Sequence, residues 1–82
     1  MTKFALIRHG RTTDRVGTYD TIEAAKVAAE PYNPHPIVEH DGEWVAHPKI
    51  YRTDDVIRHK SIWGAGTDNP NVGLAIWELE VE

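Results

Sequence analysis

Cysteine is absent from the 82 residues of this chain, which excludes disulfide bonds and thiolate metal sites. Long apolar runs are also missing. No stretch approaches the roughly 18 residues of a membrane span, and the N-terminus has no apolar core of a signal peptide. We therefore expect a soluble cytoplasmic protein that does not contact a membrane.

Positive charge is scarce as well. Nine Lys and Arg stand against 13 Asp and Glu, for a net charge of −4, and the basic residues are scattered rather than gathered into the stripe of a nucleic-acid binder. This balance favours a protein partner or a small ligand over nucleic acid. The length allows one domain, 1–82, and three Trp, three Tyr and one Phe supply much of its burial.

The first third of the chain predicts two strands and a helix. Residues 3–9 alternate as a strand with two faces, Phe4, Leu6 and Arg8 against Ala5, Ile7 and His9. A short second strand is expected over 15–19. The main helix spans 21–30, with a capping box formed by Asp20 and Glu23, and Pro31 ends it. Its buried stripe consists of Ile22, Ala25, Ala28 and Ala29.

The middle of the chain predicts a β-hairpin followed by an ambiguous segment. Asp41-Gly42 fits a two-residue type I′ turn between strands over 37–40 and 43–46. In the next segment, Thr53 can cap a second short helix over 54–62, with Asp54 and Asp55 in its first turn. An extended strand over 56–63 is the alternative, and the helix is preferred.

The chain closes with the clearest strand, "LAIWELEVE". One face of it holds Ala75, Trp77, Leu79 and Val81, and the other holds Ile76, Glu78, Glu80 and Glu82. Together these elements predict an α+β fold, an antiparallel sheet of about four strands with the helix 21–30 packed on one face.

The run Arg8-His9-Gly10-Arg11-Thr12 resembles the signature of the histidine phosphatase (phosphoglycerate mutase-like) family. The resemblance implies a phosphorylated histidine at His9 and arginines that clamp phosphate. That family has a much longer doubly wound domain and needs a second histidine and an acid. His59 is the only later histidine beside an arginine, and its surroundings do not resemble the second motif. We therefore interpret the run as a solvated strand end, and assign no catalytic residue.

The five histidines do not show the spacing of a metal site. Zinc needs three or four convergent ligands, and none of these residues lies on a predicted helix at a chelating spacing. In the predicted hairpin, His40 and His47 are also too far apart along the ladder to bind one ion. We expect no metal and no cofactor.

Acidic and aromatic residues supply the candidate contact surface. The row Glu78, Glu80 and Glu82 either protects an exposed sheet edge from aggregation, which is preferred, or docks onto a basic groove. At least two of the three tryptophans should be core. Trp63, beside a Gly-rich loop, is the candidate for a surface anchor, although a core position is slightly favoured for it. The candidate partner-binding residues are Glu78, Glu80, Glu82, Trp63, Arg8 and Arg11.

The order of elements, from the strand "KFALI" through the helix "DTIEAAKVAA" to the hairpin "VEHDGEWV", resembles small phage-encoded accessory proteins. The resemblance implies a non-enzymatic protein that occludes a surface on a host protein, as host-takeover and anti-defence factors do. The sequence therefore predicts a binding protein that blocks or modulates a protein partner. A phosphoryl-handling enzyme using His9 and a nucleic-acid-binding module are the alternatives, and the partner's identity and homodimerisation stay open.

Overall fold

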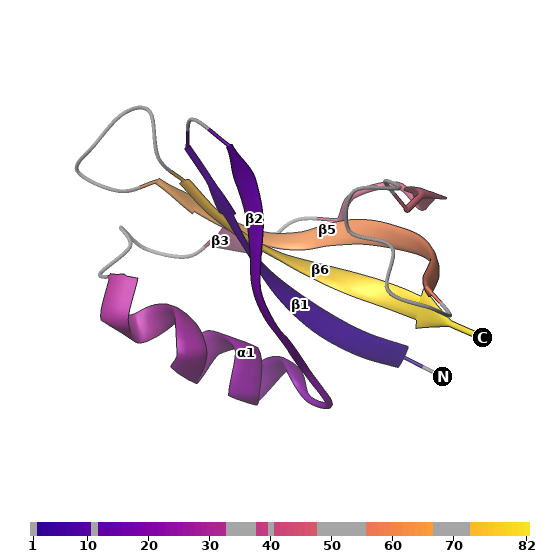
Figure 1. Ribbon diagram of the computed structural model, residues 1–82, viewed down its shortest axis with the longest axis horizontal. Coiled ribbons are helices and arrows are strands. Elements are labelled where there is room, and N and C mark those ends of the chain that lie inside the picture. Colours follow the sequence, from indigo (N-terminus) through magenta and orange to yellow (C-terminus); the bar gives the residue numbers. More distant parts are fainter. Residues whose placement is uncertain (1, 11, 33–37, 40, 48–55, 67–72) are drawn as a thin grey trace.

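The computed structural model describes residues 2–10, 12–32, 38–39, 41–47, 56–66 and 73–82 (Figure 1). Six strands, one α-helix and one short 3-10 helix follow each other along these residues. They are β1 (Thr2–His9), β2 (Thr13–Tyr19), α1 (Ile22–Ala29), η1 (Glu30–Tyr32), β3 (Val38–Glu39), β4 (Val45–Ala46), β5 (Val56–Gly66) and β6 (Gly73–Val81). No helix among them is long and apolar enough to cross a membrane.

All six strands belong to one antiparallel sheet. The strands β2, β1, β6 and β5 lie side by side in that order, and β3 and β4 both pair with the outer edge of β5. Figure 1 shows α1 on one face of this sheet. The α+β class and the main helix are confirmed, while the sheet is larger than the expected four strands.

The C-terminal strand β6 lies in the middle of the sheet rather than at its edge. It pairs with β1 on one side, where Ala5 faces Trp77, and with β5 on the other, where His59 faces Leu79. The expectation that its glutamate row protects an exposed edge is therefore wrong. The alternation of its two faces is confirmed, because Trp77 and Leu79 belong to one core cluster and Ile76 to the other.

The helix α1 covers one face of the sheet through small side chains. Ala25 and Ala29 are almost completely buried, so the helix backbone approaches the sheet closely. The cap differs from the prediction. Thr21, not Asp20, is the N-cap residue, and its Oγ1 accepts a hydrogen bond from the backbone N–H of Ala24 at 3.2 Å. Asp20 instead forms an ion pair with Lys3 of β1.

The preferred helix over 54–62 is wrong from Val56 onward, where β5 begins; residues 54–55 lie outside the described residues. This segment supplies the second neighbour of β6, and a central strand needs hydrogen-bond partners on both edges. Its β-branched and aromatic residues suit a strand. Tertiary pairing therefore outweighs the local helix-capping signal.

The hairpin centred on Asp41-Gly42 is wrong too. Val38 pairs with Gly64, and Val45 pairs with His59, so β3 and β4 follow the same edge of β5 instead of pairing with each other. Between them, the backbone N–H of Gly42 donates to the Ser61 carbonyl at 3.0 Å. A Cβ at position 42 would lie 2.6 Å from that oxygen. Glycine here serves close backbone approach rather than a turn.

The sheet is buried on both faces. The cluster on the α1 side consists of Leu6, Ala25, Ala29, Leu74 and Ile76, with Trp63 among the partly buried side chains packed against it. The cluster on the opposite face consists of Ala5, Ile7, Val56, Ala75, Trp77 and Leu79. Two buried histidines, His47 and His59, accompany this second cluster through their contacts with Trp77.

Candidate functional site

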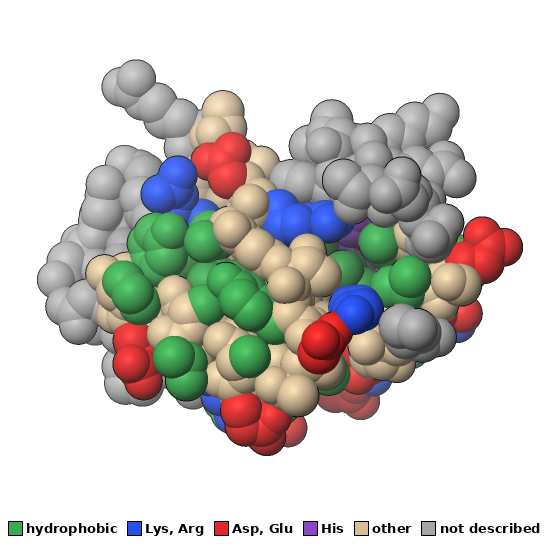
Figure 2. All heavy atoms as spheres, turned by 60° about the horizontal axis from the view of Figure 1, so that its bottom comes forward, with side chains coloured by type: hydrophobic (Ala, Val, Ile, Leu, Met, Phe, Trp, Pro, Cys, Tyr) green, Lys and Arg blue, Asp and Glu red, His purple; other side chains and the backbone are tan. Residues whose placement is uncertain are grey.

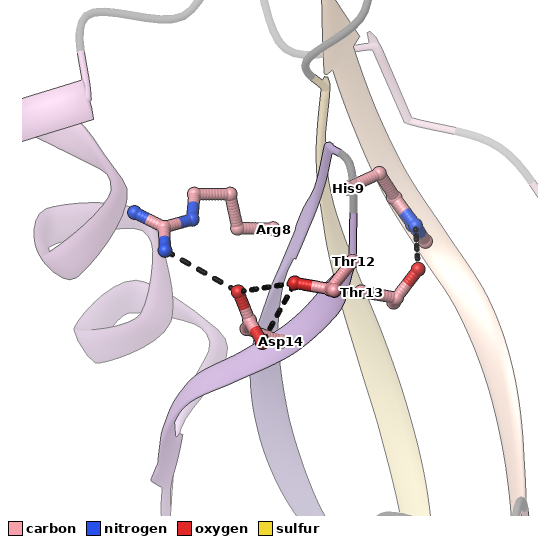
Figure 3. A network of polar contacts seen from close by, with 5 residues as sticks. All are labelled: Arg8, His9, Thr12, Thr13 and Asp14. Carbon is pink, nitrogen blue, oxygen red and sulfur yellow. Dashed lines mark hydrogen bonds and ion pairs between the residues drawn. The ribbon is translucent and has the colours of Figure 1, made fainter.

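The Arg-His-Gly run lies where β1 ends and the chain turns into β2. Figure 3 shows the Arg8 side chain reaching toward α1 while His9 points to the other side of the strand pair. Arg8 Nη2 lies 3.3 Å from Asp14 Oδ2, and its guanidinium lies 5.8 Å from the centre of the Tyr32 ring. His9 Nδ1 lies 3.4 Å from Thr13 Oγ1, and Trp77 is its ring neighbour. Adjacent residues of a strand point to opposite faces.

This arrangement does not bring Arg8 and His9 to a common ligand. A phosphate bound to the imidazole would lie on the face opposite the Arg8 guanidinium, which Asp14 already neutralises in part. The partner-binding candidate Arg11 lies outside the described residues. His59 shares the face of His9, but Trp77 lies between the two rings, at 4.0 Å from His59 and 6.4 Å from His9.

A cluster of imidazoles surrounds Trp77 on the face opposite α1. His59 stacks on the indole at 4.0 Å with an interplanar angle of 20°. His47 meets His59 edge-on at 5.3 Å, and Arg15 Nη2 lies 2.8 Å from His47 Nε2. A guanidinium is always a donor. In this contact the guanidinium therefore donates and the Nε2 atom of His47 accepts.

The cluster is unfavourable for a further positive charge. Burial lowers the pKa of His59 below its usual value of 6.5, and the neighbouring His47 lowers it further. The buried Nδ1 of His59 has no hydrogen-bond partner among the described residues. His59 is therefore a neutral, aromatic packing group at pH 7.

The described residues contain no group of three or more His, Asp or Glu side chains that could hold a metal ion. The pairing of His47 with His59 was not foreseen from the sequence. It depends on β4 lying beside β5, where Val45 faces His59. The predicted hairpin and helix would have separated these histidines.

A hollow of about 540 Å³ lies on the α1 side of the sheet, where the start of α1 meets β3, β5 and β6. Its walls combine apolar and charged side chains, contributed by Ile22, Glu39, Asp41, Lys60, Ile62, Trp63 and Glu78. Glu39 and Asp41 are exposed, so the hollow is open to solvent along β3. This volume is in the range of sites that hold small ligands.

Charge in the hollow is predominantly negative. Lys60 Nζ lies 3.5 Å from Asp41 Oδ1. Within the part of the chain that the structure describes, Glu39 and Glu78 form no ion pair. Lys26, one helical turn beyond Ile22, does not line the hollow, but its Nζ lies 3.8 Å from the centre of the Trp63 ring. The lining of the hollow therefore combines three carboxylates and one ammonium group with an indole and two isoleucines.

The predicted contact residues lie in different places. Glu78 and the half-buried Trp63 line the hollow. Glu80 forms an ion pair with Arg58 of β5, and Glu82 is exposed beyond the end of β6. The most exposed of the three indoles is Trp44, at 36% of its surface, and Arg58 and Lys60 approach its ring to 5.2 and 5.4 Å.

Several of the described basic side chains are each paired with an acidic residue. Arg8, Arg58 and Lys60 each pair with a carboxylate, from Asp14, Glu80 and Asp41 respectively. On the face drawn in Figure 2, blue side chains lie in separate places between acidic and hydrophobic ones, and the hydrophobic ones gather largely on the side where α1 lies in Figure 1. No basic stripe is formed by the residues drawn in colour on this face.

Comparison of the chain with protein-family models, curated proteins and solved structures found no match. A function for this chain is therefore inferred from the geometry of its own residues.

Proposed function

We propose that this chain is a non-enzymatic binding protein that blocks or modulates a protein partner, and that the hollow beside α1 is its contact surface. The observation that carries this proposal is the composition of the hollow, where apolar Ile22, Ile62 and Trp63 lie beside three carboxylates and the ammonium of Lys60. Apolar area surrounded by polar groups is the usual organisation of a protein-binding site.

The position of the hollow supports occlusion as the mode of action. Most of its lining belongs to regular elements, since Ile22 begins α1 and Glu39, Lys60, Ile62, Trp63 and Glu78 belong to strands of the sheet. A partner segment seated there would be held against a surface that needs little rearrangement. This mode agrees with the expectation of a host-takeover or anti-defence factor that acts by covering a surface.

The phosphoryl-handling alternative has less support, because Arg8 and His9 lie on opposite faces of β1. A nucleic-acid-binding role is also less favoured, because the carboxylates of the hollow repel phosphates and, among the described residues, Arg8 and Arg58 are paired with carboxylates.

The test is capture of a partner by immobilised protein from a host-cell lysate at physiological salt. The double variant Glu39→Lys/Glu78→Lys reverses charge inside the hollow and should lose a partner that the parent retains. Glu30→Lys/Glu82→Lys makes the same change in net charge at two exposed residues outside the hollow and should retain it.

Three outcomes would contradict the proposal. The parent retains no partner, or both double variants retain the partner equally, or the protein hydrolyses p-nitrophenyl phosphate with an activity that disappears in His9→Ala. The last outcome would identify the chain as an enzyme. Circular dichroism of each variant controls for folding.

A further inference from the structure

We infer that the partner segment held in the hollow carries a Lys or Arg side chain, which takes the place on the Trp63 ring that Lys26 holds in the free protein. This inference rests on the proposed function, because it specifies the chemistry of the group that the hollow binds.

The contact between Lys26 and Trp63 shows that the indole face already accepts a cation. The ammonium nitrogen lies 3.8 Å from the ring centre, well within the roughly 6 Å over which a cation is attracted to an aromatic face. Lys26 is part of α1, and Trp63 is part of β5. The helix therefore supplies a cation to an aromatic ring that lines the hollow.

The carboxylates make the hollow complementary to positive charge. Glu39 on β3 and Glu78 on β6 enter it from different strands, and the ammonium of Lys60 is directed to Asp41. An arriving Lys or Arg side chain would find two carboxylates that form no ion pair within the described residues. An acidic or phosphorylated segment would be repelled by both.

The apolar lining of the hollow favours a peptide over an isolated ammonium ion. Ile22 and Ile62 are apolar and half-buried, so they can pack against the aliphatic stem of a Lys or Arg side chain or against a neighbouring hydrophobic residue. The hollow is large enough, at about 540 Å³, for more than one side chain. The occupant with this chemistry is a basic segment that also carries aliphatic residues.

Lys26 is then a competitor of the partner. A segment that places its own cation on Trp63 must displace the ammonium of Lys26, which also adds positive charge beside the binding site. Removing Lys26 should therefore increase the affinity, although the residue lies next to the site. If Lys26 only stabilised the fold around Trp63, its removal would lower the affinity instead.

The experiment is a selection of random 12-residue peptides displayed on filamentous phage against the immobilised full chain. Enriched peptides should carry net positive charge with Lys or Arg next to aliphatic residues. The most enriched peptide is then synthesised and its affinity is measured by fluorescence anisotropy. Lys26→Met should bind it about threefold to tenfold more tightly, the change expected from one partly exposed cation–π contact.

Two further variants locate the binding. Glu39→Gln/Glu78→Gln should weaken it about tenfold, in line with the loss of two partly exposed charge contacts. Glu30→Gln/Glu82→Gln, which removes the same charge outside the hollow, should leave it within about twofold of the parent, since distant exposed charges are screened. Lys26→Met keeps helix propensity, so the fold is preserved.

The inference is overturned if no peptide is enriched, if the enriched peptides are neutral or acidic, or if Lys26→Met weakens binding. These results are distinguishable from failure of the proposed function. A partner captured from lysate and lost in the Glu39→Lys/Glu78→Lys variant, together with non-basic peptides, would retain the binding role and reject the cation. Enriched basic peptides without any partner captured from lysate would retain the preference for a cation and reject the proposed binding role.

Discussion

His59 is buried, stacks on Trp77 and lies next to His47, and this environment makes the folding stability depend on pH. The charged or titratable groups that face it among the described residues are His47 after β4, Arg15 of β2 through its contact with His47, and His9 of β1 across Trp77. None of these is a carboxylate that could stabilise a protonated His59.

Because the pKa of His59 is lowered in the folded protein, the unfolded chain binds a proton more readily between its usual value of 6.5 and the folded value. The contribution of His59 to folding stability is complete above pH 6.5 and declines as the pH falls below it. We expect the urea unfolding midpoint to be lower at pH 5.0 than at pH 7.5. In His59→Gln this dependence should be reduced, and an unchanged dependence would contradict the role given to His59.

Also at the residue scale, the separation of Arg8 from His9 could be predicted from the sequence. The alternation of residues 3–9 places them on opposite faces of a strand, and β1 confirms it. The grouping of His47 with His59 and Trp77 could not be predicted. It needs the register of β4, β5 and β6, which is set by contacts between distant segments.

At the scale of elements, the start of α1 gives a direct test of the cap. Thr21→Ala removes the side chain that accepts the Ala24 N–H, and should lower the free energy of unfolding by about 1 kcal/mol. Asp20→Ala removes only an ion pair with Lys3 whose carboxylate is largely exposed, worth about 0–1 kcal/mol with a small expected effect. Urea unfolding followed at 222 nm measures both. A larger effect of Asp20→Ala would identify Asp20 as the cap after all.

Elements with strong local signals were predicted well, and elements defined by their neighbours were not. The strands β1 and β6 and the helix α1 follow from alternation and helix propensity, and β2 begins two residues before the expected 15–19. Pro31 does not end the helical backbone as expected, because Glu30 keeps helical angles and Pro31 lies in η1. The strand β5 carries two conflicting local signals, and the pairing with β6 decides between them. The edge formed by β3 and β4 depends in turn on β5, so one wrong element produced the second error.

The hollow was only partly predictable for the same reason. Trp63 and Glu78 were singled out as contact residues, and both line it. These two residues come close to Glu39 and Ile22 only because β3 and β6 lie on either side of β5 and α1 covers this face of the sheet. The sequence indicated that acidic and aromatic side chains form the contact surface, and the order of the strands determined which of them line the hollow.

At the scale of the whole molecule, both faces of the sheet should contribute to stability. Leu6 on the α1 side and Leu79 on the opposite side are each fully buried. Leu6→Ala and Leu79→Ala should each lower the free energy of unfolding by about 2–5 kcal/mol, because both leave a cavity. Val27→Ala, at a residue that is 62% exposed, should change it by less than about 0.5 kcal/mol.

Thermal unfolding measures this difference, since 1 kcal/mol shifts the Tm of a domain of this size by about 4–8 °C. Both leucine variants should unfold in a single transition, as expected for one cooperative sheet. If Leu79→Ala behaved like Val27→Ala, the face opposite α1 would not be a core.

The middle strand of the sheet, β6, is the last of the described strands to leave the ribosome. During translation β1 and β2 can pair early, but β1 and β5 lack their shared neighbour until Val81 has emerged from the exit tunnel. A nascent chain stalled before Gly73 would therefore present the apolar rows of β1 and β5 to chaperones. The complete sheet therefore forms only after β6 is available to both of its neighbours, however quickly the first hairpin forms.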